Sequence, residues 1–295
     1  MSSELIQLIN TLNQTGQAIP ISITTTTTTN WPQFATSLIL GSFMMFWLFG
    51  SIFIESIKAK NTKVLLKLFK LKTKRNVLMI KHTQQALFGG SMIDQKTLRD
   101  ITKALTKFKG KDFDLILHTP GGEIFPALFI SRIFKNYPGK IRTIIPMYAM
   151  SGGTLLTLST DEVFMSPTSC LGPVDPQLGT LFKFGSAKSW DRILKFKGKK
   201  AEDSSISMAF TGKQYTKTIN SYLKEITDFG MSKEDKKKFI DFITNGSVEH
   251  AFALTPYELK KLNFPVKRIG SRIQERLIKL VGSASAEGVT YATIK

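Results

Sequence analysis

Cysteine and histidine are scarce in this sequence. Cys170 is the only cysteine, which excludes an internal disulfide framework and a cysteine-based zinc cluster. The three histidines, His82, His118 and His250, leave little room for a histidine-rich metal site. We therefore expect neither a metal nor any other cofactor.

Basic residues are absent from the beginning of the chain. Residues 1–57 contain no lysine or arginine, although all 295 residues together carry a net charge of +19. Residues 24–29 are six consecutive threonines, a composition typical of an exposed irregular segment. Residues 34–54 hold no charged residue, and this run is long enough to cross a hydrocarbon core of ~30 Å. A buried core helix fits this run less well because no polar face recurs at helical period, and a cleaved signal peptide would begin with basic residues.

A strongly basic stretch follows the apolar run. Residues 58–75 contain eight lysines and arginines and no acid. The positive-inside rule then predicts a single-pass membrane protein, with residues 1–33 outside, 34–54 as a transmembrane helix and the C-terminal side in the cytoplasm. Residues 55–75 are expected to form a basic juxtamembrane linker. Its VLLKLFKLK segment is either a surface helix on anionic membrane lipid or a solvated connection.

The remaining excess charge is spread over the rest of the chain. No basic motif interleaved with aromatic residues is present, so a lysine-rich composition explains the charge better than nucleic-acid binding does. We expect no nucleic-acid partner.

From residue 76 onwards the pattern is α/β. Apolar strand-like runs alternate with segments of helical periodicity, which predicts βαβ units and a mostly parallel sheet. The expected strands are residues 76–82, 112–118, 140–148 and 161–167, and the expected helices are 93–108, 123–137, 151–159, 208–228, 232–243 and 256–262.

Two junctions between a strand and a helix contain the residues suited to catalysis. In the first, Gly121 and Gly122 follow a strand, so the backbone can approach a ligand closely. In the second, Ser151 precedes two glycines at a helix start, where an exposed nucleophile has room for a substrate and nearby N–H groups. Either motif alone is also typical of a plain turn or of a helix N-cap. Successive strands bring both junctions to the same edge of the sheet, so they can face one cleft.

Three segments in this order resemble the serine dehydrogenase proteinase family. They are LILHTPGGEIFPALFI, IIPMYAMSGGTLLTLSTDEVFMSP and LGPVDPQLG, and the resemblance is strongest over residues 77–180 and looser to about residue 270. This family belongs to the Clp-fold serine peptidases, together with the Clp protease and signal peptide peptidase A groups. The resemblance implies a Clp/crotonase-like superhelix of ββα units over residues 76–270, followed by a C-terminal tail, 271–295.

The resemblance also implies roles for individual residues. Ser151 would be the nucleophile, and backbone N–H groups of Gly121, Gly122 and Gly152 would form the oxyanion hole. Asp175 lies in a rigid GPVDPQ loop, which is either a structural turn or a direct participant in catalysis. At Met147 the family leads us to expect a more polar residue, and this departure supports the alternative of a catalytically weak protein of the same fold.

The general base is not evident from the sequence. In the Clp protease branch a histidine follows the nucleophile, but here that region holds Asp175. In the signal peptide peptidase branch a lysine of lowered pKa serves as the base, and Lys217 is the best match to it. Lys213 and Lys200 are alternatives.

The histidines are assigned other roles. His118 directly precedes the TPGG motif and is expected to shape the site rather than to act as the base. His82 has no partner visible from the sequence. His250 is interpreted as structural.

The leading hypothesis is a membrane-anchored serine endopeptidase with a Ser-Lys dyad that cleaves protein or peptide chains. One alternative is a catalytically weak scaffold or assembly protein of the same fold. The other is a crotonase-type acyl-CoA enzyme, which Ser151 at a helix start disfavours because that chemistry usually needs carboxylates in the cleft. Clp-fold units generally form rings, so the resemblance also implies a homo-oligomer.

Overall fold

The computed structural model describes residues 31–83, 91–179, 183–246, 248–282 and 287–293. The chain divides into two compact units, Met1–Ile52 and Phe53–Lys295. Helix α2 (Trp31–Thr73) runs from the first unit into the second. Among the described residues, the sheets and the other helices all belong to the second unit. The threonine run at residues 24–29 lies outside the described residues.

A six-stranded sheet forms the centre of the second unit. Its strand order is β10-β1-β2-β3-β5-β9, and all neighbours are parallel except β10, which pairs antiparallel with β1. The mixed α/β fold expected from the sequence is therefore confirmed. The strands are β1 (Asn76–Lys81), β2 (Phe113–His118), β3 (Ile141–Ile145), β5 (Glu162–Met165), β9 (Lys267–Arg268) and β10 (Gly288–Ala292).

The continuous apolar runs of the sequence become the central strands because these strands are covered on both faces. Every residue of β1 and of β2 is buried. Helix α3 (Gln95–Phe108) begins where the Asp94 side chain accepts a hydrogen bond from Thr97 N, and it ends at Lys109 in a left-handed conformation. Helices α4 (Ile124–Lys135) and α5 (Gly152–Leu158) start directly after the two glycine junctions.

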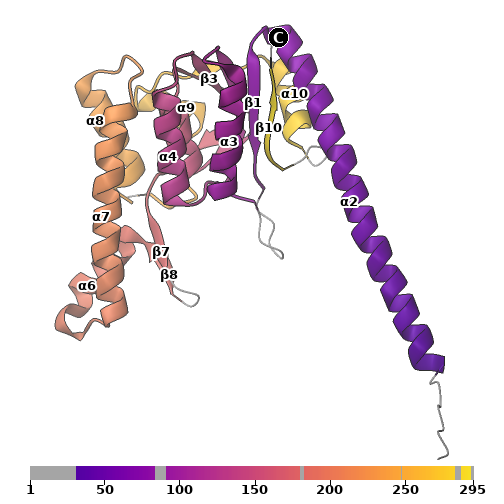
Figure 1. Cartoon of the computed structure of the whole chain (residues 1–295). Coiled ribbons are helices and arrows are strands. Elements are labelled where there is room, and N and C mark those ends of the chain that lie inside the picture. The colour runs from indigo at the N-terminus through magenta and orange to yellow at the C-terminus, as the bar shows by residue number, and fades with distance from the viewer. Residues whose placement is uncertain (1–30, 84–90, 180–182, 247, 283–286, 294–295) are drawn as a thin grey trace, which may run out of the picture. The chain divides into compact units, whose positions relative to one another are not determined.

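Two hydrophobic clusters cover opposite faces of the sheet. The larger one joins strand residues such as Leu78 and Leu115 to side chains of α3, α4 and α5. The smaller one joins Val77, Ile116 and Ile144 to the C-terminal part of α2 and to α10 (Ser271–Val281). Figure 1 shows α3 and α4 on one side of β1 and α10 on the other.

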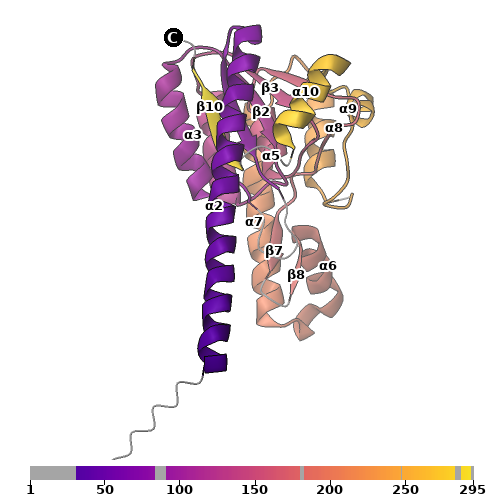
Figure 2. The same cartoon turned by 90° about the vertical axis from the view of Figure 1, so that its right-hand side faces the viewer.

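The remaining elements surround the ends of the sheet. Short strands pair in two ribbons, β4 (Tyr148–Ala149) with β6 (Cys170–Leu171) and β7 (Gln177–Gly179) with β8 (Phe184–Ser186). Figure 2 shows the β7–β8 ribbon and α6 beside the same end of the long helix α7. The helical elements here are α6 (Ala187–Lys197), the 3₁₀ turn η1 (Gly198–Lys200), α7 (Asp203–Ile226), α8 (Lys233–Thr244) and α9 (Pro256–Lys261).

The segment expected to be a C-terminal tail is part of the fold. Helix α10 buries Leu277 and Leu280, and β10 extends the sheet, with Met79 opposite Thr290. The boundary at residue 270 was based on where the family resemblance fades. It does not mark the end of the core, because the second face of the sheet is covered by residues beyond it.

The prediction of a membrane anchor is wrong. The apolar run and most of the basic stretch form one helix of 43 residues that ends at Thr73, and Leu66 within the basic stretch is completely buried. In the part of the chain that the structure describes, no helix combines the length and the apolar character needed to cross a membrane. The orientation inferred from the distribution of lysine and arginine depended on that span and falls with it.

Candidate active site

Ser151 lies in a strained turn between β4 and α5. Its backbone has φ 49° and ψ −113°, a conformation that residues other than glycine rarely adopt. The side chain makes no capping hydrogen bond to the helix that follows, so the hydroxyl is not used as an N-cap. Instead, Ser151 lines a hollow of about 470 Å³.

The glycine turn after β2 forms the adjacent wall of this hollow. Gly121 and Gly122 have φ 110° and φ 158°, and their backbone is held by Ile93, whose N–H donates to Gly121 O and whose carbonyl accepts from Glu123 N, both at 2.8 Å. A Cβ at Gly122 would lie 2.2 Å from Ile93 O. Only glycine fits this close approach.

The two junctions together present unpaired backbone N–H groups to the hollow. A Cβ at Gly121 would lie 2.9 Å from Ser151 Cβ, and one at Gly152 would lie 3.6 Å from Gly122 N, so the two turns are in contact. Within the described residues, the N–H groups of Gly122 and Gly152 have no acceptor. Both glycines line the hollow beside Ser151. Such a pair of N–H groups can bind a developing oxyanion.

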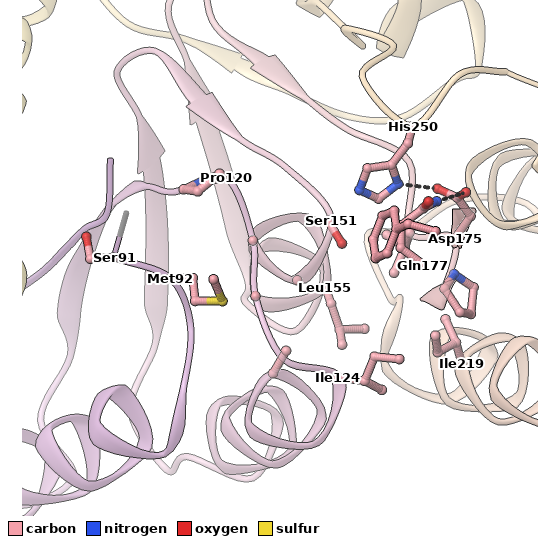
Figure 3. A pocket seen from close by; sticks show the side chains of 17 residues that line it. Ser91, Met92, Pro120, Ile124, Ser151, Leu155, Asp175, Gln177, Ile219 and His250 are labelled. Atoms are coloured by element: carbon pink, nitrogen blue, oxygen red, sulfur yellow. Dashed lines mark hydrogen bonds and ion pairs between the residues drawn. The ribbon is translucent and has the colours of Figure 1, made fainter. Parts of the chain in front are cut away.

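A histidine–carboxylate pair forms the opposite wall. His250 Nδ1 donates to Asp175 Oδ1 at 2.6 Å, and Gln177 Nε2 donates to Asp175 Oδ2 at 2.7 Å. Asp175 is only 5% exposed, so its carboxylate is fixed by these bonds. Figure 3 shows the Ser151 hydroxyl pointing toward the side of the hollow where His250 and Asp175 lie.

Apolar side chains line the floor between these walls. Ile124 and Ala127 come from α4, Leu155 from α5 and Ile219 from α7, and Val174 precedes Asp175. The hollow can therefore hold an apolar group next to the serine.

Comparison with known proteins identifies the family. A family model described as ClpP-like SDH-type serine proteinase matches residues 31–282. This chain belongs to the ClpP-like SDH-type serine proteinase family. The resemblance inferred from the sequence is thereby confirmed, and so is the ClpP-like fold.

Two relatives of this family member come from Methanocaldococcus jannaschii. The uncharacterized protein MJ0137 is 34% identical over 205 residues, which is 66% of this chain and 70% of the relative. The uncharacterized protein MJ1495 is 30% identical over 210 residues, which is 69% of this chain and 70% of the relative.

Solved structures similar to this family member include ClpP1 from Listeria monocytogenes, with a TM-score of 0.42 and 16% identity over 70% of this chain and 98% of that one. A point mutant of the 1510-N membrane-bound stomatin-specific protease gives a TM-score of 0.43 and 17% identity. The match covers 63% of this chain and 79% of that one.

The lysines expected to act as the base lie away from Ser151 in this family member. Lys217 is exposed on α7 and lines two other hollows, whereas Ile219 of the same helix lines the serine hollow. Two residues correspond to about 200° of helical rotation, which turns Lys217 away. Lys213 is ion-paired with Asp191 at 2.8 Å, and Lys200 is exposed on the 3₁₀ turn.

The other expected site residues have mixed outcomes. His118 is buried at the end of β2 and does not line the serine hollow; its ring centroid lies 4.1 Å from that of Tyr148. Burial lowers the pKa of His118 to about 4. Met147, where the family led us to expect a polar residue, is 41% exposed and does not line the hollow either. The missing polar group therefore does not remove a side chain from the lining of the serine hollow.

His250 is the functional candidate that the sequence analysis missed. It is separated from Asp175 by helices α6 to α8, and no local motif connects the two residues. The scarcity of histidine is the only sequence signal that could have drawn attention to it.

Proposed function

We propose that this protein is a serine peptidase in which Ser151 is the nucleophile, His250 the general base and Asp175 the residue that orients His250. The observation that carries this proposal is that the Ser151 hydroxyl and the His250–Asp175 pair line one hollow. A serine needs such a proton acceptor in order to attack a carbonyl.

Each of the three residues has a distinct task in the reaction. The Asp175 carboxylate accepts a hydrogen bond from Nδ1–H of His250, which leaves Nε2 free to take a proton. When Ser151 Oγ attacks the carbonyl carbon, its proton passes to Nε2. His250 then returns that proton to the departing amine, and water hydrolyses the acyl-enzyme by the same steps. Gln177 keeps the carboxylate in place through its second oxygen.

The oxyanion is bound by the backbone. The N–H groups of Gly122 and Gly152 are without acceptors among the described residues and face the hollow, so they can donate to the negative oxygen of the tetrahedral intermediate. Fixed donors of this kind typically contribute about 10²–10³-fold each to the rate.

The proposed substrate is a protein or peptide chain with an apolar side chain next to the scissile bond. Ile124, Leu155 and Ile219 provide the apolar surface for that side chain. A Ser-Lys dyad with Lys217 remains a prediction. The exposed position of Lys217 on α7 favours His250 instead.

Labelling with a fluorophosphonate probe tests the nucleophile. Mass spectrometry of the digested protein is expected to locate the probe on Ser151, and Ser151→Ala to abolish both labelling and peptide cleavage. Ser91→Ala is the matched control because Ser91 lines the same hollow but bonds to Glu287. The proposal is contradicted if the probe labels another residue of the folded protein. It is also contradicted if the folded Ser151→Ala variant still cleaves peptides.

A further inference from the structure

A second large hollow lies on the opposite face of the sheet from the proposed active site. It measures about 790 Å³, and it opens between the C-terminal part of α2, the strands β3 and β5, and α10. None of its lining residues lines the serine hollow. Its volume is within the range of ~300–1,000 Å³ that small-molecule sites occupy.

The hollow exists because the helical cover of this face is incomplete. Leu66 of α2 and Leu277 of α10 are fully buried in the cluster that covers the sheet. Farther along the sheet, Ile144, itself a member of this cluster, and the half-buried Phe164 packed against it also line the hollow. Leu68 of α2, which also lines it, is 58% exposed. Apolar surface left open in this way is typical of a binding site.

Basic side chains surround the apolar interior. Lys72, Arg268 and Arg276 line the hollow, and none has an acidic partner among the described residues. Asp114, the one carboxylate among the described lining residues, is already held by Arg142 at 2.8 Å and by Arg75 at 3.0 Å. The hollow therefore combines an apolar interior with uncompensated positive charge.

The polar groups of the lining distinguish between kinds of ligand. A buried peptide needs a partner for each N–H and C=O group. Thr73 Oγ1 is the only buried side-chain nitrogen or oxygen atom of the described lining that lacks a hydrogen-bond partner. An alkyl chain makes no such demand, so the lining suits an alkyl chain better than a peptide.

We propose that this hollow binds a free single-chain amphiphile with an anionic head group, of the fatty-carboxylate class. The alkyl chain lies against Ile144, Phe164 and Leu68. The carboxylate lies near Lys72, Arg268 and Arg276. The proposal is independent of the peptidase chemistry, and Ser151→Ala is expected to bind the amphiphile as the unaltered chain does.

Calorimetric titration of the full chain with decanoate and with 1-decanol tests this proposal. We expect one decanoate per chain, bound at least ten-fold more tightly than the uncharged alcohol of equal length. Equal binding of the two, or no binding of either, overturns the proposal. Binding to phosphatidylglycerol vesicles without binding to decanoate also overturns it.

Three variants locate the site. Arg276→Glu is expected to weaken decanoate at least ten-fold and to leave 1-decanol unchanged, whereas Arg272→Glu on the same helix, outside the lining, changes neither. Leu68→Glu is expected to abolish binding of both, with an unchanged circular dichroism spectrum because Leu68 is exposed. The assignment is overturned if Arg276→Glu binds decanoate as the unaltered chain does. It is also overturned if light scattering shows that Leu68→Glu dissociates the oligomer.

Discussion

At the scale of single residues, Ser151 combines strain with function. A side chain at φ 49° and ψ −113° costs about 1–3 kcal/mol, which glycine does not incur. Ser151→Gly is therefore expected to raise the free energy of unfolding by about 1 kcal/mol, after allowing for the greater freedom of glycine in the unfolded chain. Ser151→Ala keeps the strain and is expected to change stability by less than about 0.5 kcal/mol. Urea unfolding measures both, and equal stability of the two variants contradicts the strain.

The buried histidines predict a loss of stability in acid. Burial lowers the pKa of both His82 and His118 from 6.5 to about 4. Between these values the unfolded chain binds more protons than the folded one, so stability falls as the pH drops from 6.5 toward 4. By pH 5 each residue is expected to cost about 2 kcal/mol.

Urea unfolding at pH 7.5 and pH 5 checks this expectation. The double variant His82→Asn, His118→Gln is expected to lose much of the pH dependence. His250→Gln, a change at a more exposed histidine, is the control and keeps it. A free energy of unfolding that is the same at both pH values refutes the assignment.

At the scale of elements, the junction between β2 and α4 depends on one close contact. Gly122→Ala places a Cβ 2.2 Å from Ile93 O and forces φ 158° on a residue with a side chain. The expected result is a loss of about 2 kcal/mol or more in stability, together with loss of labelling at Ser151. Gly270→Ala is the control, because a Cβ there has nothing within 4 Å. A Gly122→Ala variant of unchanged stability contradicts this geometry.

The same elements show what a sequence can predict. The apolar strands β1 and β2 and the helices that start at the glycine junctions were predicted because their signals are local. Strand β10 was not, since its place beside β1 depends on a pairing across the whole chain. The prediction divided the residues of α2 into a membrane span and a linker because the charge changes along this segment. The backbone conformation does not change, so the segment forms one helix.

At the scale of the whole molecule, exposed aromatic side chains on α6 and α7 support the predicted homo-oligomer. Phe196 is 92% exposed and Phe210 is 64% exposed. We expect light scattering to give a mass of at least three chains, and Phe210→Asp to lower it. Tyr257→Asp on α9, at an equally exposed position, is expected to leave the mass unchanged. A mass of a single chain for the unaltered protein contradicts the predicted homo-oligomer.

The candidate site was only partly predictable for the same reason as the fold. Ser151, Gly122 and Gly152 belong to short motifs whose spacing reflects local backbone geometry. Asp175 was noticed as part of a rigid loop. His250 contacts Asp175 although helices α6 to α8 separate the two residues in the chain. A contact between residues so far apart leaves no local pattern in the sequence.

The rate of fluorophosphonate labelling at Ser151 in two matched variants tests the central claim most directly. His250→Ala is expected to lower the rate by about 10³-fold or more, as removal of a catalytic base typically does, and added imidazole to restore part of it. Lys217→Ala is expected to keep the rate within about two-fold, because its side chain lies outside the serine hollow. Full labelling of His250→Ala, with loss of labelling in Lys217→Ala, would contradict the account and establish the lysine as the base.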